Sequence, residues 1–253
     1  MRPGSMRASV FVVTAIAAFL TASGRGHAAD APAGFTPLFN GRDLAGWKVP
    51  VGDNGHWKVV DGVVDYDARS EASGDKSLWT ERAFGNFVLR VDWRIKDTPW
   101  VNPRVRIVMP DGSNKKGPDG KEIEIAVPDS DSGIFLRGKP DAQVNIWCWP
   151  VGSGEVYGYR TAANAAPEVR AGVTPKVNAD RDIGQWNRFE ITMKGELLTV
   201  VLNGVTVIES ARLPGVPAKG PIALQHHGEW KDGTWTSPPA LVQFRDIAIR
   251  ELP

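Results

Sequence analysis

The sequence predicts an all-β protein, a β-sandwich of the jelly-roll type built from one domain. Many short segments alternate apolar and polar residues, which is the period of a half-buried strand. Glycine (27) and proline (19) are frequent between these segments, and no stretch keeps a helical period. Short strands at regular spacing are typical of sandwiches, and about 225 residues can bury one large core.

The N-terminus has the layout of a secretory signal peptide. Arg2 and Arg7 precede an apolar run over residues 10–20, and small residues follow up to Ala28 and Ala29. The run is too short for a permanent transmembrane helix. We therefore expect residues 1–29 to be removed and the mature chain to be periplasmic or secreted, without an integral membrane segment.

The rest of the chain predicts a short linker over residues 30–37 and a single folded domain over residues 38–253. Cys148 is the only cysteine, so no internal disulfide can form. The charges are balanced, 30 basic against 29 acidic residues, without a run of one sign. This balance argues against nucleic acid as a partner. The oligomeric state stays open.

Several strands in the first half have clear sequence signals. Asp61-Gly62 separates two apolar runs within residues 55–66, which predicts a hairpin. Residues 87–95 alternate strictly, so one face should be core and the other wet. A loop is expected over residues 100–103, followed by two alternating strands, RVRIVM and KEIEIAV.

The second half begins with a long, polar, Pro-bearing excursion over residues 161–182, expected to run over the surface. Residues 186–210 then predict three strands, with turns at Lys194-Gly195 and Asn203-Gly204. Two strand segments follow, PIALQHHG and LVQFRDIAIREL. In the last one the apolar phase shifts, which predicts a bulge at Arg245-Asp246.

The stretch from Asp129 to Tyr159 is the main candidate for a binding site. Gln143, Asn145 and Trp147 share one phase of a strand, while Val144 and Ile146 share the other. Two amides and an indole on one face suit sugar hydroxyl groups. The further candidates for substrate binding are Tyr157 and Gln225.

Six dispersed motifs, which occur in order along the chain, resemble those of a known protein family. They are WKVVDGVV, LWTERAFGNFVLRVDWRI, DSGIFLRG, WNRFEITMKGELLTVVLNG, IALQHHG and VQFRDIAIREL. The chain resembles the 3-keto-disaccharide hydrolase domain family from about Phe35 to Leu252. The resemblance implies a concanavalin A-like jelly roll. It also implies action on 3-keto-glycosides, as a lyase that forms a 3-keto-2-hydroxy-glucal or as the hydratase of that product.

The chain departs from the family pattern at two places. Where the family often has Glu-x-Gln and a nearby Asp, QVNIWC provides Gln143, Asn145 and Cys148. Where the family often has Asn before SGI, this chain has Asp131. The identity of the catalytic base is therefore open.

The implied chemistry needs a base, an oxyanion partner and a proton donor. A ketone at sugar C3 acidifies the C2 proton, so a base can form an enolate that expels the group at C1. His227, in LQHHG, matches the family motif and has a suitable unperturbed pKa. Arg137 is the candidate for stabilising the enolate, and Glu155, the first carboxylate after the strand of residues 143–147, is a further catalytic candidate.

No cofactor is certain from the sequence. One divalent cation could replace Arg137 as the electrophile, with Asp129 and Asp131 offering oxygen ligands, so the metal is left unknown.

Two other functions remain open. Glu122 and Glu124 on one strand face would suit a retaining glycoside hydrolase, although Ala126 takes the position of a third carboxylate. A non-catalytic, lectin-like carbohydrate-binding module could instead stack sugars on tryptophans; the candidates are Trp147, Trp149, Trp230 and Trp235.

Overall fold

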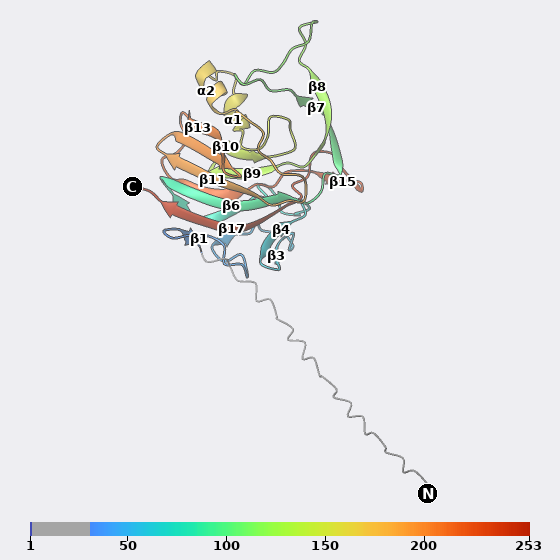
Figure 1. The fold of residues 1–253 in the computed structure, drawn as a ribbon, viewed down its shortest axis with the longest axis vertical. Helices are drawn as coiled ribbons and strands as arrows, with labels where there is room; N and C mark the ends of the chain where they lie inside the picture. Colours follow the sequence, from blue (N-terminus) through green and yellow to red (C-terminus); the bar gives the residue numbers. More distant parts are fainter. Residues whose placement is uncertain (2–30) are drawn as a thin grey trace.

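The computed structural model describes Met1 and residues 31–253 (Figure 1). The signal-peptide prediction falls on residues 2–29, outside the described residues. Residues 31–253 form one sandwich with the core between two antiparallel sheets. The prediction of a single-domain, all-β sandwich is confirmed.

The larger sheet has eight strands. In spatial order they are β13 (Val205–Arg212), β12 (Leu197–Leu202), β11 (Asn187–Lys194), β6 (Phe87–Ile95), β17 (Val242–Glu251), β4 (Val63–Tyr66) and β3 (Trp57–Val60), with β1 (Thr36–Pro37) added to β17. Because β1 pairs with β17, ordered pairing begins within residues 30–37, the segment expected to be a linker.

The smaller sheet has five strands. In spatial order they are β10 (Lys139–Ile146), β9 (Ser132–Leu136), β14 (Gly220–Leu224), β5 (Leu78–Phe84) and β2 (Trp47–Lys48). One face of this sheet packs on the larger sheet. The other face, here called the outer face, turns toward the helices and the β7–β8 ribbon (Figure 1).

Alternation along the strands builds the core. In β6 the residues Phe87, Leu89, Val91, Trp93 and Ile95 are all buried between the sheets, as their period of two predicts. Because a shift of one residue would expose this entire set to water, burial of one face fixes the register of the strand.

The turns and the bulge lie where the sequence places them. Asp61 and Gly62 join β3 to β4 with φ of 51° and 79°, and Asn203 and Gly204 join β12 to β13 with φ of 52° and 85°. Positive φ at both positions is the type I′ geometry that Asp-Gly and Asn-Gly favour. The register of β17 against β6 shifts between Arg245 and Ala248, which is the expected bulge.

A two-stranded ribbon rises beside the outer face. It consists of β7 (Trp100–Arg106) and β8 (Glu124–Asp129), so the strand begins in the segment 100–103 that we expected to be a loop. The register of the pair shifts between Asn102 and Val105, which accommodates Pro103. A second small ribbon, β15 (Trp230–Lys231) with β16 (Thr234–Trp235), lies on the same side (Figure 1).

The connection between β7 and β8, residues 107–123, is here called the arm. It leans across the outer face toward α1 (Tyr157–Arg160) and α2 (Pro167–Gly172) (Figure 1). Arg160 Nη1 donates to Asn114 Oδ1 at 3.2 Å, and Gly112 lies so close to Arg170 that a Cβ there would be 2.5 Å from its Cγ. The arm, the ribbon and the two helices therefore border the outer face.

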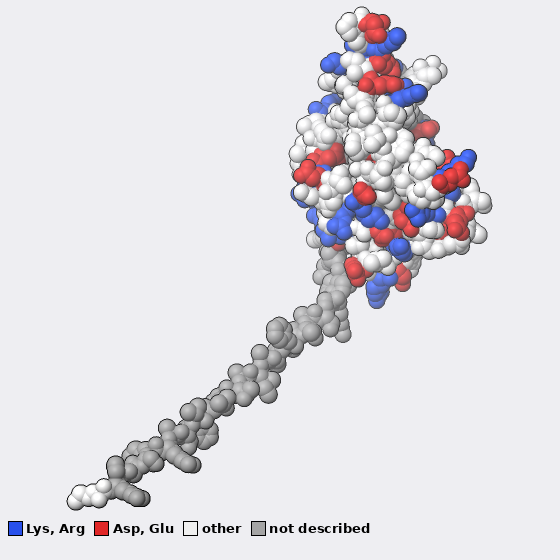
Figure 2. Space-filling model, turned by 90° about the vertical axis from the view of Figure 1, so that its right-hand side faces the viewer, with Lys and Arg blue, Asp and Glu red and all other residues white. Residues whose placement is uncertain are grey.

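The described surface and helices carry two further facts. α2 lies within the surface excursion 161–182, and neither helix is long or apolar enough to cross a membrane. Figure 2 shows basic and acidic side chains interspersed on the visible face, without a large field of one sign.

Candidate functional site

The strand register places the candidate amides on the outer face. Val144 pairs with Ile134, and both are buried in the core. Gln143 pairs with Phe135, and Asn145 pairs with Gly133, so these residues take the opposite face. Gln225 continues this row, since its backbone N–H donates to the Gly133 carbonyl at 2.9 Å.

Gly133 allows two glutamines to meet across the sheet. A Cβ at this position would lie 2.3 Å from Nε2 of Gln143, which shows that the Gln143 side chain crosses directly over Gly133. The same Nε2 donates to Ser132 O at 3.1 Å and to Oε1 of Gln225. Because Gln225 accepts through its oxygen, its own NH₂ group remains as a donor on the outer face.

The segment around Pro239 brings His227 to the start of β9. Ser130 Oγ donates to the Pro239 carbonyl at 2.6 Å, and Asp131 N donates to the same carbonyl at 3.3 Å. Ala240 N donates to the His227 carbonyl at 2.9 Å. One short segment therefore binds both the β8–β9 link and the chain after β14.

The hydrogen bond of the His227 ring defines its tautomer. Nδ1 lies 2.6 Å from the Pro238 carbonyl, and a carbonyl can only accept, so Nδ1 carries the proton. In the neutral ring Nε2 therefore holds the basic lone pair. His227 is partly exposed, as a group that must reach a substrate has to be.

Asp131 provides a carboxyl group beside this histidine. Burial raises the pKa of Asp131 to about 7, the charge of His227 opposes that rise, and the charge of Asp129 adds to it. The residue still keeps partial contact with solvent. A carboxyl of this pKa exchanges its proton near neutral pH, which general acid catalysis requires.

Asp129, two residues earlier, is fully buried, and both of its carboxylate oxygens accept hydrogen bonds. Its carboxylate accepts from Asn102 Nδ2 at 3.1 Å, from Trp149 Nε1 at 3.1 Å and from the Cys148 backbone at 3.3 Å. Burial raises its pKa, and these three donors oppose the rise. Asp129 therefore supports the site rather than contacting a ligand.

The ring of His226 bonds a different part of the fold from that of His227. Its Nδ1 lies 2.6 Å from the Tyr66 hydroxyl on the core side. Burial lowers the pKa of His226 to about 4, so it stays neutral.

Arg137 does not belong to this site. Its guanidinium donates to the carbonyls of Gly85 at 2.8 Å, Gly195 at 2.7 Å and Pro217 at 3.2 Å, and to the side chain of Asn86. These partners lie at the far end of β9, on loops of both sheets. The geometry argues against the prediction that Arg137 stabilises an enolate, because all of its donors point into the fold.

Glu155 bonds Arg160 through Oε1, while its buried Oε2 has no hydrogen-bond partner among the described residues, although we expected a carboxylate that could act on substrate. It is fully buried and bonded to Arg160, and burial raises its pKa to about 7. Its backbone pairs with Asn145 at the free edge of β10. His227 follows β14, three strand positions away, or roughly 14 Å. The two residues therefore cannot act on one proton.

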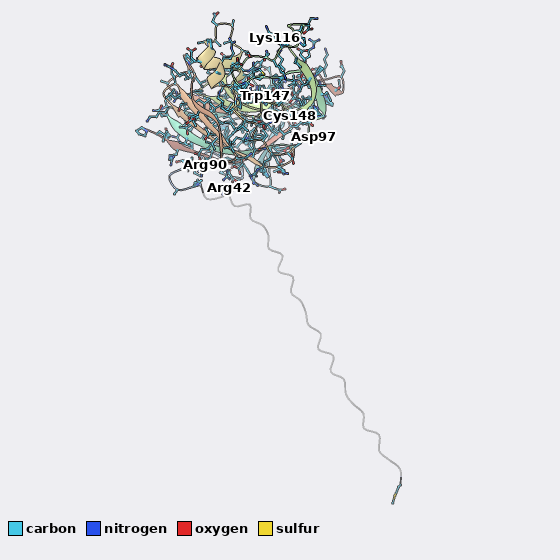
Figure 3. All side chains as sticks on the ribbon, turned by 45° about the horizontal axis from the view of Figure 1, so that its top comes forward. Arg42, Arg90, Asp97, Lys116, Trp147 and Cys148 are labelled. Atoms are coloured by element: carbon cyan, nitrogen blue, oxygen red, sulfur yellow. The ribbon has the colours of Figure 1, made fainter. Side chains whose placement is uncertain are left out.

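The remaining candidates form an aromatic group at the end of β10. Trp147 stacks on Trp149 with ring centroids 4.2 Å apart, and Tyr157 meets both rings edge-on. Trp147 is buried and donates to the Gly152 carbonyl. Asn145 is buried, and its Nδ2 has no partner among the described residues. Figure 3 shows where Trp147 and Cys148 lie; Trp147 is buried and Cys148 is partly exposed.

The donor set does not fit a cation held by Asp129 and Asp131. Both oxygens of Asp129 already accept hydrogen bonds. Within residues 31–253 no group of three or more His, Cys, Asp or Glu side chains is arranged to hold a metal ion.

Glu122 and Glu124 do not belong to the group of outer-face residues described above. Both pair with Arg106 on the β7–β8 ribbon, with the shorter contact at 2.6 Å, and both are exposed. Hydrogen bonding from Asn114 lowers the pKa of Glu122, whereas an acid of a retaining hydrolase needs a raised one.

A family model decides the assignment: it describes a 3-keto-alpha-glucoside-1,2-lyase-like domain and matches residues 34–250. The chain belongs to this family. The resemblance inferred from the motifs is therefore confirmed, and the family makes this a carbohydrate-acting chain.

Solved structures agree with the family in fold. Two candidate glycosyl hydrolases from Parabacteroides distasonis ATCC 8503 are similar to this chain. The first has a TM-score of 0.52 and 23% identity, over 87% of this chain and 84% of that one. The second has a TM-score of 0.51 and 17% identity, over 87% and 95%. At these identities the likeness concerns the fold alone. No curated protein matches this 3-keto-alpha-glucoside-1,2-lyase-like chain.

Sequence reasoning did not single out Asp131 as a titratable group beside the outer face. It treated that residue as a candidate ligand of a cation. The available signal was the substitution of Asp for the Asn that often precedes SGI in the family, at the position where the strand leaves the buried Asp129.

Proposed function

We propose that this protein cleaves 3-keto-glycosides by removing the C2 proton and eliminating the group at C1, and that it also hydrates the resulting 3-keto-2-hydroxy-glucal. The observation that carries the proposal is that the segment of residues 238–240 holds both His227 and Asp131, through the Pro238 and Pro239 carbonyls, at the edge of an amide-lined face. These two groups and the glutamines Gln143 and Gln225 are here called the outer-face site.

The first step belongs to His227. Its Nε2 takes the C2 proton, and the electrons of that C–H bond form the enolate with the C3 oxygen. The Nδ1 bond to Pro238 keeps the ring oriented and stabilises the imidazolium that forms. The NH₂ group of Gln225 is the donor placed to stabilise the C3 oxyanion.

The second step needs an acid, and we assign this role to Asp131. When the C3 carbonyl forms again, the C1=C2 double bond forms and the C1–O bond breaks. The leaving oxygen takes the proton of Asp131, which is protonated in about half of the molecules at neutral pH because its pKa is raised to about 7. Addition of water to the double bond then gives net hydrolysis.

The direct test is incubation of the protein with a 3-keto-glycoside and with its unoxidised parent. We expect release of the aglycone from the ketone only, because the parent has no acidic C2 proton. In heavy water the product should carry deuterium at C2. Release from the parent would favour a retaining hydrolase, and binding without release would favour a lectin-like module.

We propose that the protein is exported, to the periplasm or beyond. An intact mass that retains Met1 would contradict this. We also propose that the side chains named above act without a resident cation, so a chelator should leave the rate unchanged. A loss restored by added divalent metal would contradict that.

A further inference from the structure

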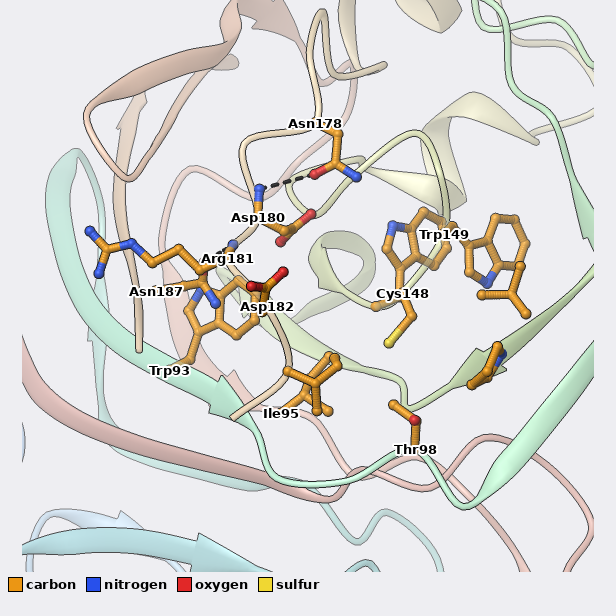
Figure 4. A pocket seen from close by; sticks show the side chains of 14 residues that line it. Trp93, Ile95, Thr98, Cys148, Trp149, Asn178, Asp180, Arg181, Asp182 and Asn187 are labelled. Carbon is orange, nitrogen blue, oxygen red and sulfur yellow. Dashed lines mark hydrogen bonds between the residues drawn. The ribbon is translucent and has the colours of Figure 1, made fainter. Parts of the chain in front are cut away.

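A cavity, here called the tryptophan pocket, lies outside the outer-face site. Its volume is about 480 Å³, within the roughly 300–1,000 Å³ range of ligand pockets. It is placed where the end of β6 meets the chain after β10, and its walls include Trp93, Trp147 and Trp149 (Figure 4). None of Asp131, Gln143, Gln225 and His227 lines it.

Two buried polar atoms of its wall residues have no partner among the described residues. Nε1 of Trp93, a side chain only 1% exposed, donates to nothing, and Oδ1 of Asp180 accepts nothing. The other oxygen of Asp180 accepts from the Ser153 backbone at 2.8 Å, which fixes the carboxylate. One is a donor and the other an acceptor, so the hydroxyl groups of a ligand, which donate and accept, can satisfy both.

The charges around the pocket define the ligand further. In Figure 4 the carboxylates of Asp180 and Asp182 face the cavity, whereas the guanidinium of Arg181 is directed away. Arg181 Nη1 is occupied by the Trp186 carbonyl at 2.9 Å. A negatively charged ligand would be repelled, and a purely apolar one would leave the carboxylates dry.

We propose that the tryptophan pocket binds a neutral sugar ring, with hydroxyl groups bonded to Trp93 Nε1 and to Asp180 Oδ1 and an apolar ring face against the indoles. Aromatic walls with a few fixed polar groups are the usual composition of a carbohydrate site. The proposal goes beyond the eliminating activity, since the pocket holds its ligand without chemistry. Trp149 links the two regions, because it lines this pocket and donates to Asp129.

Titration calorimetry with glucose, and with glucuronate as the anionic comparison, tests this proposal. We expect glucose to bind and glucuronate to bind at least about 5-fold more weakly. Trp93→Phe keeps the aromatic ring and removes one donor, so it should weaken glucose binding about 5-fold. Trp186→Phe is the matched control. Trp186 stacks with Arg94 and Arg245 outside the pocket, so its loss should leave glucose binding unchanged.

A blocking variant covers the case in which Trp93→Phe fails to fold. Ile183 lines the pocket and is 49% exposed, so Ile183→Trp fills space without disturbing the core. It should abolish glucose binding while aglycone release continues, whereas His227→Ala should do the reverse. Glucose binding that survives Ile183→Trp, or no glucose binding by the wild type, would overturn the proposal and leave the eliminating activity to its own test.

Discussion

The two ends of strand β9 both bury charged groups, but they treat them differently. At the C-terminal end the Arg137 guanidinium has a partner for each of its nitrogens, including three backbone carbonyls. At the N-terminal end, no described side chain donates to the Asp131 carboxyl, and burial raises its pKa to about 7. The Asp131 carboxyl can therefore still form a hydrogen bond with a substrate. The Arg137 guanidinium cannot, because its hydrogen bonds are made within the fold.

The largest expected effect concerns the N-terminal end of β9, near Asp131. His227→Ala should lower the rate of aglycone release about 100- to 10,000-fold, because a general base is lost. The circular dichroism spectrum should not change, since the ring is partly exposed and bonds only one carbonyl. His226→Ala is the control. That ring contacts Tyr66 on the core side, so its loss should lower the melting temperature more than the rate. A more damaging His226→Ala would contradict the assignment.

At the C-terminal end of β9, where each nitrogen of the Arg137 guanidinium has a partner, we expect a substitution to change the stability of the protein and not its rate. Arg137→Met leaves the carbonyls of Gly85, Gly195 and Pro217 without donors, so we expect a loss of about 2–4 kcal/mol in the free energy of unfolding. The rate per folded molecule should stay the same. Urea unfolding beside an activity assay separates the two effects. Arg212→Met, which removes an exposed arginine paired with Glu196, should cost less than about 1 kcal/mol.

A smaller effect distinguishes the two ends by pH. Asp131 has a folded pKa above its unfolded value, so the folded state binds the proton more tightly. The free energy of unfolding therefore falls as pH rises from about 4 to about 7. Asp131→Asn should remove this fall and stabilise the protein at pH 8 relative to wild type. We expect on the order of 2 kcal/mol, reduced by the partial solvent contact of the carboxyl. Unfolding curves with parallel pH dependence in both proteins would contradict the raised pKa.

The smallest expected effect concerns the amide bridge. Gly133→Ala places a Cβ 2.3 Å from Nε2 of Gln143, so the bond from Gln143 to Gln225 has to break. We expect KM for the 3-keto-glycoside to rise about 3- to 10-fold with little change in kcat. Gly85→Ala is the control, because its Cβ would meet only a carbonyl at 3.6 Å. Equal kinetics in both variants would show that the bridge has no part in binding.

The features that the sequence predicted correctly are those that depend on residues close together along the chain. Hairpins such as Asp61-Gly62 and the two faces of residues 87–95 depend on neighbours along the chain, so local patterns were enough. The surroundings of Arg137 could not be predicted in this way, because its partners lie near residues 85, 195 and 217. The role of Asp131 depends on His227 and on Pro239, about a hundred residues away, and no local pattern encodes that contact.

The arm over the outer face has a consequence for the length of substrate. Its end packs on Arg170 and Arg160, so the chain crosses above the sheet from the ribbon to the helices (Figure 1). An internal segment of a polysaccharide laid along the sheet would have to thread beneath this crossing. A terminal unit or a small glycoside can enter end first. We therefore expect exo-type action on short glycosides, with the product leaving after each turnover instead of processive movement along a polymer.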